Sequence, residues 1–513
     1  MPTYATYGKD GRRIQQPNSG LYGQVPNPKR IDIDNPHEGK PEPTVLIIGA
    51  GTFGTSTAYH LAQHYKDPSR VTIIDQAPCP PKPAASIDVN RVIRTDYANK
   101  LYCDLACETI HPWFWSEELG PYFHKVGWLM YEEEGSSLKS RIKSTFESRG
   151  STQFQDVTLD QIPQQWTALR GTSHQGFQAA YFNPEAGWCD AASATQAFMK
   201  SAERRGIRRE TGKVVSLIRN DDCGTISGAR TLDGRIFEAE KVVLAAGPWT
   251  SQILSPTEEE LNLPYESRIE RQIQATGLVA AYYRVSDEEV QQLNQFQTPV
   301  VVYGGLGEII PPDNSNSNTS SNKLMKYANS RSGIINTVPV NPSSPAGARI
   351  SVPADDQYHI PECLKRETKA MISDRVLPDF ARGKEPDYWR ICWDAQTPTE
   401  DFLICKHPEK KLEGLYIATG GSFHSYKFLP IIGKYILNTL YNTSNGSEKD
   451  LAWGWKTPTS TPTSTKTTTT TEKEMKWVDI HERGLLSHKR VLKTELRELF
   501  ARDKKGNTTS SRL

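Results

Sequence analysis

A glycine-rich turn after an apolar run constrains the fold of this chain more than any other feature. Residues 45–48 (VLII) are typical of a buried parallel strand, and Gly49, Gly51 and Gly54 follow them before a helical pattern over residues 55–64. In the spacing G-x-G-x-x-G the first glycine permits a tight turn, and the second lets the backbone approach a pyrophosphate. The third allows close packing of helix on strand, and the helix N-terminus stabilises phosphate charge. This pattern predicts a dinucleotide site.

The next apolar run completes a strand–helix–strand unit. Residues 71–75 (VTIID) end in Asp75, about 20 residues beyond the glycine turn. A carboxylate at this position can bind a ribose 2′-hydroxyl, so an unphosphorylated ribose is favoured over NADP. The predicted cofactor site also includes the residues between the glycines, which are Ala50, Thr52 and Phe53.

The composition argues against several classes of protein. Lys and Arg number 61 and Asp and Glu 60, so a net charge of +1 gives no electrostatic footprint for nucleic acid or an anionic membrane. No run approaches the ~18–20 apolar residues that span a bilayer, and residues 1–42 lack the apolar stretch of a secretory signal. The eight cysteines include no C-x-x-C pair, which argues against a disulfide scaffold and a zinc site. We expect a soluble, intracellular, globular protein without a metal.

The 513 residues divide by composition into four parts. Residues 1–42 are polar and proline-bearing, and we expect a disordered lead. Alternating apolar runs and helical patterns over 43–441 predict a mixed α/β body. A low-complexity linker over 442–474 follows. Residues 475–513 are predicted to form an amphipathic helix, with apolar Leu492, Leu496, Leu499 and Phe500, and a tail.

A second segment distinguishes FAD from NAD as the dinucleotide. Residues 231–249 predict a hairpin and then a buried strand, which ends in Ala246, Gly247, Pro248 and Trp249. This arrangement resembles the second nucleotide-proximal strand of the glutathione-reductase-type FAD fold, in which a small-residue turn passes close to the cofactor. We add Val214, Ala246, Gly247 and Trp249 to the predicted cofactor site.

Three further segments resemble the D-amino acid oxidase superfamily. They are residues 85–94 (ASIDVNRVIR), 388–402 (YWRICWDAQTPTEDF) and 414–433 (GLYIATGGSFHSYKFLPIIG). Within the superfamily they are similar to the branch of monomeric sarcosine oxidase, fructosyl amino acid oxidases (amadoriases) and fungal saccharopine and pipecolate oxidases. The resemblance covers about residues 44–441, and its motifs occur in family order.

The resemblance implies a fold and a division of the body. It implies a glutathione-reductase-type Rossmann FAD-binding domain with an antiparallel-sheet substrate domain. The FAD-binding parts would be about 43–120, 190–255 and 385–441, and the substrate domain about 121–189 and 256–384.

The resemblance also implies roles for particular residues. Cys392 would be joined covalently to the 8α-methyl group of FAD, and Arg94 and Lys427 would bind the substrate carboxylate. A lysine over the flavin would activate oxygen, and the best alignment nominates Lys326 over Lys323. A surface charge is the alternative for Lys326. Further residues near the cofactor would be Asp88, Asn90, Arg91, Gly420, Gly421, Ser422 and His424.

Two of these assignments have alternatives. Arg91 could support the flavin or a neighbouring carboxylate, and His424 could lie near the isoalloxazine or be a hydrogen-bonded structural histidine. The amadoriase pattern has an acidic pair and an aromatic residue where this chain has Asn329, Ser330 and Ile334. That departure argues against a sugar-adduct substrate but not against an oxidase.

The implied activity is that of an FAD-dependent oxidase acting on CH–NH donors. It would oxidise the secondary amine of an N-substituted or cyclic amino acid with O₂, giving an imine and H₂O₂. The alternatives are a tailoring amine oxidase of an alkaloid pathway, a flavin-binding scaffold without turnover, and an NAD dehydrogenase. Retention of Cys392, Lys326, Arg94 and Lys427 disfavours the scaffold, and nothing resembles a second nicotinamide site.

The last three residues suggest a location. Ser511, Arg512 and Leu513 are a conservative variant of the S-K-L peroxisomal address. We therefore expect a peroxisomal import receptor as a partner, with the cytoplasm as the alternative location. The protein is expected to be a monomer.

Overall fold

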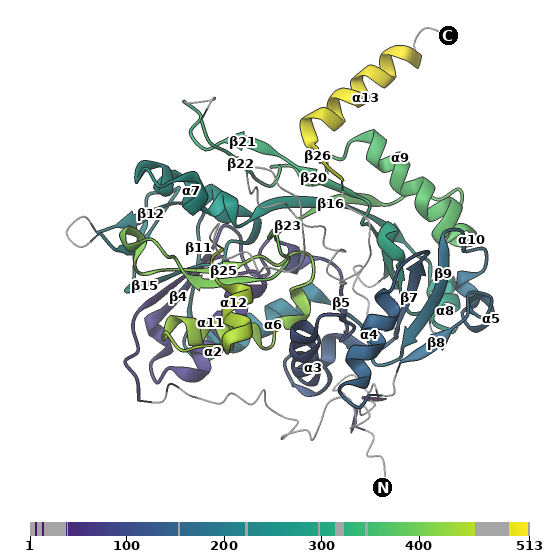
Figure 1. The fold of residues 1–513 in the computed structure, drawn as a ribbon, viewed down its shortest axis with the longest axis horizontal. Helices are drawn as coiled ribbons and strands as arrows, with labels where there is room; N and C mark the ends of the chain where they lie inside the picture. The colour runs from purple at the N-terminus through teal and green to yellow at the C-terminus, as the bar shows by residue number, and fades with distance from the viewer. Residues whose placement is uncertain are drawn as a thin grey trace, which may run out of the picture.

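Two large sheets organise the computed structural model, and each forms the centre of one lobe (Figure 1). One sheet is mostly parallel and the other mostly antiparallel, which confirms the predicted mixed α/β class. The structure describes residues 6–7, 13–14, 37, 39–151, 154–220, 224–295, 298–312, 323–343, 347–456 and 492–510.

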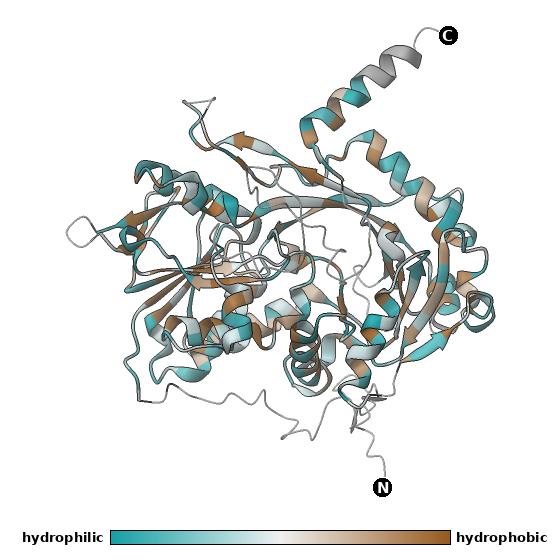
Figure 2. Cartoon of the chain, in the orientation of Figure 1, coloured by the Kyte–Doolittle hydropathy of each residue, from teal (hydrophilic) through white to brown (hydrophobic). Residues whose placement is uncertain are grey.

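The parallel sheet begins with the strand that precedes the glycine turn. Its strands are, in spatial order, β11 (Arg208–Thr211), β4 (Val71–Asp75), β3 (Val45–Ile48), β15 (Lys241–Leu244), β25 (Leu415–Thr419) and the antiparallel edge strand β24 (Leu403–Lys406). Helices α2 (Thr52–His64), α6 (Ala191–Arg204) and α11 (Ile432–Leu440) pack on one another beside it. Its central strands are buried on both faces, so they are apolar along their length (Figure 2).

A smaller sheet and a helix complete this lobe. The sheet contains β12 (Val214–Arg219), β13 (Ile226–Thr231) and β14 (Ile236–Glu238), and its hairpin precedes β15 as predicted. Helix α7 (Thr250–Glu260) follows the Gly247–Trp249 turn and shares a core cluster with the central strands.

The antiparallel sheet curves across the second lobe (Figure 1). Its path is β26 (Leu492–Glu495), β20 (Ser332–Ile335), β16 (Gln274–Arg284), β19 (Leu324–Asn329), β18 (Gly307–Ile310), β17 (Val300–Tyr303), β7 (Trp128–Glu133), β9 (Phe177–Asn183) and β8 (Gln155–Val157). Strand β23 (Tyr388–Gln396) also pairs with β16. It thus belongs to this sheet, although residues 385–441 were assigned to the FAD-binding parts.

Residues of the antiparallel sheet alternate between two cores. Val301, Ile309 and Tyr327 pack in an outer cluster with residues of α9 (Glu362–Met371) and α10 (Pro378–Ala381). Val302 and Ile310 instead pack in the core shared with the parallel sheet. The inner face of the antiparallel sheet is therefore directed toward the lobe of the parallel sheet.

The C-terminal region differs from the sequence prediction in two places. The body continues past 441, because α12 (Ser447–Trp453) buries Trp453 against the core. Near the end of the chain, Leu492 lies in β26, since this strand extends the sheet by pairing with β20, and helix α13 (Leu496–Ser510) starts only afterwards. Most of the lead, residues 457–491 and Ser511–Leu513 lie outside the described residues.

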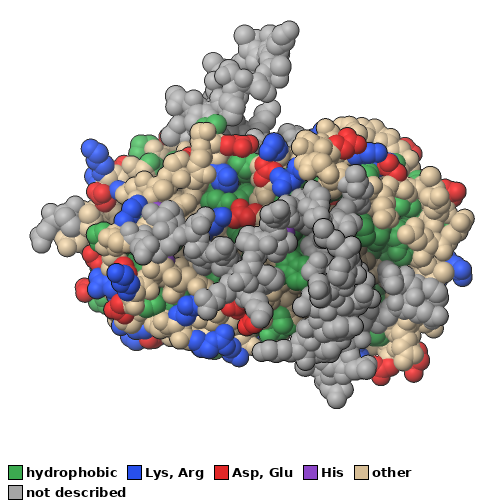
Figure 3. Space-filling view, turned by 90° about the horizontal axis from the view of Figure 1, so that it is seen from below, with side chains coloured by type: hydrophobic (Ala, Val, Ile, Leu, Met, Phe, Trp, Pro, Cys, Tyr) green, Lys and Arg blue, Asp and Glu red, His purple; other side chains and the backbone are tan. Residues whose placement is uncertain are grey.

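The described part of the surface carries both signs of charge. Figure 3 shows acidic and basic side chains interspersed on one face, without a broad patch of one sign among the described residues. In the same part of the chain no helix is long and apolar enough to cross a membrane. Nor do three or more His, Cys, Asp or Glu side chains gather there as metal ligands would.

Candidate active site

The glycine turn forms one wall of a large cavity. A Cβ on Gly49, whose φ is +104°, would lie 2.5 Å from the carbonyl oxygen of Ala245 in the turn after β15. A Cβ on Gly54 would collide with the carbonyl oxygen of Gly49. At Gly51 a Cβ would meet little except the Ser86 hydroxyl at 3.8 Å, so this stretch of backbone is open toward the cavity.

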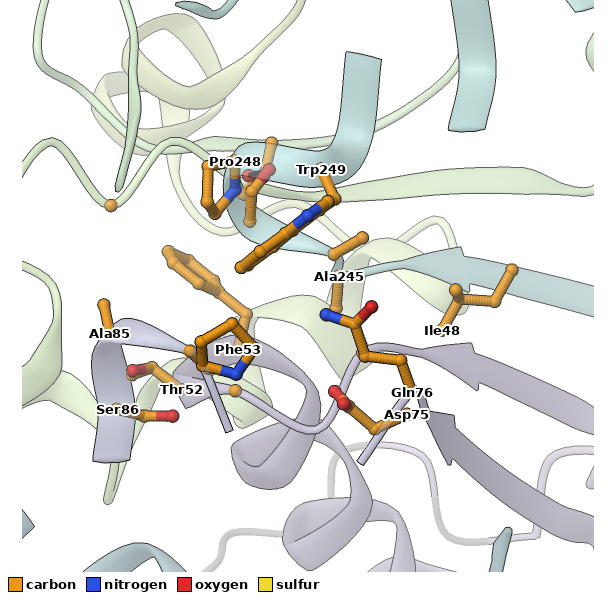
Figure 4. A pocket seen from close by; sticks show the side chains of 18 of the residues that line it. Ile48, Thr52, Phe53, Asp75, Gln76, Ala85, Ser86, Ala245, Pro248 and Trp249 are labelled. Carbon is orange, nitrogen blue, oxygen red and sulfur yellow. Dashed lines mark hydrogen bonds between the residues drawn. The ribbon is translucent and has the colours of Figure 1, made fainter. Parts of the chain in front are cut away.

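The cavity has a volume of about 410 Å³. It is lined by residues of β3 and β4 from the parallel sheet and of β23 from the antiparallel sheet. Figure 4 shows Phe53 and Trp249 lining it, with Asp75 and Gln76 at the end of β4. The predicted cofactor residues that line it are Gly49, Gly51, Thr52, Phe53, Asp75, Arg91, Val214, Ala246, Gly247, Trp249, Cys392 and Gly421. Those outside its lining are Ala50, Gly54, Asp88, Asn90, Gly420, Ser422, His424 and Lys427.

Asp75 lies where a ribose-binding carboxylate is expected. Its Oδ2 accepts a hydrogen bond from the Ala50 amide (2.7 Å), and its Oδ1 accepts one from the Ala77 amide (3.2 Å). Burial raises the pKa of this carboxyl above its usual value, and the amide hydrogen bonds oppose that shift. The carboxylate is thus held at the end of β4, beside the glycine turn.

Cys392 lies in β23 and lines the cavity, whereas its neighbours Ile391 and Trp393 pack in a separate cluster on the other face of the strand. Its sulfur accepts a hydrogen bond from the Arg91 guanidinium at 3.0 Å. The same guanidinium forms an ion pair with Asp88 (2.8 Å) and donates to the Ala85 carbonyl (2.7 Å). Arg91 therefore connects the thiol to a buried carboxylate.

Asp88 in turn binds the predicted oxygen-activating lysine. Lys326 Nζ lies 2.8 Å from Asp88 Oδ2, and both side chains are only 2% exposed. The hydroxyl of Tyr282 donates to the other oxygen of Asp88 at 2.7 Å. Burial alone would raise the pKa of Asp88, but the charges of Lys326 and Arg91 outweigh it and lower the pKa well below its usual range.

The two candidate lysines differ sharply in position. Lys323 forms an ion pair with Asp287 (2.6 Å), and the two side chains are 42% and 69% exposed. Lys326 faces inward from β19, directly opposite Tyr282 in β16. The geometry thus favours Lys326 and does not support its reading as a surface charge.

Arg94 and Lys427 lie together among buried aromatic side chains, at the proposed carboxylate pocket. The guanidinium of Arg94 lies 4.5 Å from the ring centre of Tyr97 and 5.0 Å from that of Trp128. Lys427 Nζ donates to the Tyr97 hydroxyl (2.9 Å) and to the His424 carbonyl (2.7 Å). Burial and the charge of Arg94 hold the pKa of Lys427 well below its usual value.

Sequence reasoning missed an acid that supports this pocket. Asp96 is fully buried and accepts hydrogen bonds from Tyr181 (3.1 Å) and from the Asn183 amide (2.8 Å). Arg94 also donates to the backbone carbonyl of Asp96. Its position two residues after Arg94 was the available signal, but its partners come from β9 and could not be assigned without strand pairing.

His424 occupies a structural position. Its Nε2 lies 2.9 Å from the Glu400 carbonyl, which it can contact only as a donor, and its Nδ1 lies 3.3 Å from the Tyr97 hydroxyl. Burial and the nearby charges of Lys427 and Arg94 lower its pKa to about 3, so it is neutral at physiological pH. The ring packs against Tyr102 and Phe402, which matches the structural alternative for this residue.

Sequence reasoning missed two further residues of the cavity wall, one in the turn after β25 and one in β23. Phe423 lines the cavity and has a φ of +63°, and its amide donates to Asp394 Oδ2 at 2.7 Å. Asp394 also lines the cavity, two residues after Cys392 on the same face of β23. Burial raises the pKa of Asp394 to about 6. The alternation along β23 could have suggested Asp394 once Cys392 was placed.

Known proteins resemble the chain over most of its length. A family model described as FAD dependent oxidoreductase matches residues 44–439, and the chain belongs to this family. It is 24% identical to L-saccharopine oxidase of Schizosaccharomyces pombe, over 80% of this chain and 93% of that protein. It is 26% identical to human peroxisomal sarcosine oxidase, over 76% of this chain and 90% of that protein.

A solved structure supports the same assignment. The fructosamine oxidase Amadoriase II of Aspergillus fumigatus superposes with a TM-score of 0.67 at 26% identity, covering 80% of this chain and 89% of that one. The predicted FAD-dependent oxidoreductase class and the named branch of relatives are thus confirmed.

The residues around the cavity fit FAD. Helix α2 starts without a side-chain cap, so its first amides are available to a pyrophosphate. The Ser86 hydroxyl is buried at the cavity wall and has no hydrogen-bond partner among the described residues. Asp75 suits a ribose hydroxyl, and the cavity continues from these groups to the thiol of Cys392.

Proposed function

We propose that the protein oxidises the secondary amine of an N-substituted or cyclic amino acid, with O₂ as electron acceptor. The observation that carries this proposal is that Arg94 and Lys427 are both buried and both contact Tyr97. A buried guanidinium and a nearby amine are suited to a carboxylate, which the guanidinium can bind through two hydrogen bonds.

The residues of the pocket would orient the substrate rather than transform it. FAD, when bound, would supply the redox chemistry, which is removal of a hydride equivalent from the α-carbon with O₂ as the final electron acceptor, giving an imine and H₂O₂. Arg94 and Lys427 fix the carboxylate, and the rings of Tyr97 and Trp128 exclude water around Arg94.

We also propose that FAD is joined to the protein through the sulfur of Cys392. The support is that this thiol lies at the cavity wall with the Arg91 guanidinium 3.0 Å from its sulfur.

A panel of amines tests the reaction class. N-methyl amino acids, cyclic amino acids and fructosyl amino acids should be compared by peroxide release and by bleaching of flavin absorbance without oxygen. Each acid should be paired with its methyl ester, and the esters should be much poorer substrates because losing one charged hydrogen bond costs roughly 1.5–3 kcal/mol. Equal turnover of an acid and its ester would contradict the proposed carboxylate site.

The peroxisome is the proposed location, on the basis of Ser511, Arg512 and Leu513. A fluorescent protein fused to the N-terminus should give a punctate signal. A fusion at the C-terminus should stay diffuse, because it masks the address. A diffuse signal from both fusions would contradict the proposal.

A further inference from the structure

Glu308 is a carboxylate that the mechanism above does not use. It lies in β18, where it pairs with Ala328 of β19 on one side and with Val302 of β17 on the other. Two residues further along β18, Ile310 pairs with Lys326. Because residues directly opposite one another in a sheet share a face, Glu308 lies on the same inner face as Lys326.

The neighbours of Glu308 on that face place it between Lys326 and Cys392, the two residues proposed to lie beside the flavin. Along β16, Tyr282 is opposite Lys326, Ala280 is opposite Ala328, and Leu278 is opposite Cys392. The row of the sheet that contains Glu308 therefore runs between the row of Lys326 and the row of Cys392.

This row has small side chains beside the carboxylate. Ala328 and then Ala280 follow Glu308 across the sheet. The side chains next to Glu308 in this row are thus single methyl groups. Ile309, the next residue of β18, packs in the outer cluster instead, so Glu308 does not face outward.

The carboxylate of Glu308 lacks the partners that the other acids of this region have. Asp88 and Asp96 are each held by two or more hydrogen bonds. Glu308 is half-buried, and none of the described residues donates a hydrogen bond to it or forms an ion pair with it. Its negative charge nevertheless reaches the carboxylate pocket: burial and Arg94 lower the pKa of Lys427, and Glu308 acts in the opposite direction.

We propose that Glu308 binds a second cationic group of the substrate, an ammonium on its side chain, while Arg94 and Lys427 bind the α-carboxylate. The proposal rests on the proposed function and specifies its substrate class as an N-substituted dibasic amino acid. A partly desolvated carboxylate without a counter-charge is a favourable site for a cation.

The cation bound by Glu308 cannot be the reacting amine. That nitrogen must be neutral to release a hydride equivalent from its α-carbon, and a carboxylate beside it would stabilise its protonated form. Glu308 is also displaced from the residue opposite Lys326 by two residues of β18, about 7 Å along the strand. This separation suits an ammonium at the end of an aliphatic side chain.

Two substrates that differ only at that group test the proposal. Nα-methyl-lysine carries the second ammonium, and Nα-methyl-norleucine has a side chain of similar shape without it. The wild-type holoenzyme should prefer Nα-methyl-lysine by at least about tenfold in kcat/KM. In Glu308→Gln the ratio of the two kcat/KM values should fall to about one, and Glu308→Asp should restore part of the preference.

A matched control is Glu147→Gln, which removes an exposed carboxylate from helix α4 (Leu138–Glu147) and should keep the wild-type ratio. An unchanged ratio in Glu308→Gln, or no preference in the wild type, would overturn the assignment. If the wild type oxidises neither compound, the proposed reaction class fails for N-methyl amino acids. Titration of flavin absorbance with both compounds then tests Glu308 alone, and equal Kd values would overturn its role.

Discussion

Replacing Lys326 by methionine should slow the reaction of the reduced enzyme with oxygen by about a hundredfold. The first electron that reaches O₂ forms superoxide, an anion, and a fixed ammonium nearby stabilises it. Removal of one preorganised electrostatic donor costs about 2.7–4 kcal/mol, which corresponds to roughly 100–1,000-fold in rate. We expect the lower end, because Asp88 lies 2.8 Å from the ammonium and offsets part of its field.

The fold should survive this substitution. Without Lys326, Asp88 keeps its ion pair with Arg91 at 2.8 Å and its hydrogen bond from Tyr282 at 2.7 Å, so no buried charge is left without a partner. Methionine also fills a similar volume among the buried neighbours of β19.

Stopped-flow measurement of the two half-reactions separates the roles. Anaerobic reduction of Lys326→Met by substrate should proceed near the wild-type rate, whereas re-oxidation by O₂ should be slow. Lys323→Met is the matched control, because that lysine is exposed and pairs with Asp287 at the surface. Re-oxidation of Lys326→Met at the wild-type rate would refute the assignment of the oxygen site to this residue.

Three further outcomes test other parts of the site. Acid-precipitated wild-type protein should stay yellow and Cys392→Ser should release its FAD, so a colourless wild-type pellet would contradict the covalent link. Asp88→Asn removes the counter-charge of Lys326 and Arg91 and should lower the free energy of unfolding in urea by about 3–5 kcal/mol. The double variant Asp88→Asn/Lys326→Met should lose less than the sum of the two single variants, because one of the two unpaired cations is then gone. A loss equal to that sum would disprove the coupling. Burial and the adjacent guanidinium lower the pKa of Lys427 in the free enzyme, so a bound carboxylate should raise this pKa and cause Lys427 to take up a proton. KM for acids should then rise with pH between the pKa of Lys427 in the free enzyme and its pKa in the complex. Substrate binding without proton uptake would rule out this role of Lys427.

The cofactor half of the site was predictable because its signals are local in the sequence. The strand, the glycine turn and helix α2 follow one another directly, and β4 ends in Asp75 after the helix. Backbone contacts within that unit and with Ala245 require glycine at these positions, so the spacing can be recognised in the sequence. The predicted cofactor turn at Gly247 likewise lies beside β3, because β15 pairs with it.

The substrate half depends on strand pairings that a single sequence does not reveal. Cys392 and Lys326 were nominated from resemblance alone, and only the register of β16 places both on one face. Asp96 was missed because its hydrogen-bond partners come from β9, far away in the chain, and Glu308 because only the register of β17, β18 and β19 decides which face it lies on. A polar residue in a short strand could equally face solvent, so alternation by itself does not identify them.

The distribution of charge over the inner face explains why the proposed pocket would be polarised. The single negative charge of Asp88 offsets part of the two positive charges of Lys326 and Arg91, so their combined field at a distant substrate group is reduced. Arg94 lies over the rings of Tyr97 and Trp128 and donates to the backbone carbonyl of Asp96, whose carboxylate accepts hydrogen bonds from Tyr181 and Asn183. A guanidinium stays charged at any working pH, so this end of the pocket is permanently positive.

Glu308 supplies the opposite sign on the same inner face. A site with the Arg94 guanidinium, a lysine whose pKa is lowered and a carboxylate that no described residue pairs with would stabilise a ligand whose own charges are arranged in the reverse order. An ester loses the contact at the positive end, and a norleucine side chain loses the contact at the negative end. The two losses should therefore be independent and nearly additive in log kcat/KM, since the groups involved share no hydrogen-bond partner. The four compounds to compare are Nα-methyl-lysine, Nα-methyl-norleucine and the methyl ester of each. If one rigid pocket does not bind both groups at once, the effect of the ester on log kcat/KM will differ greatly between the lysine and the norleucine compounds.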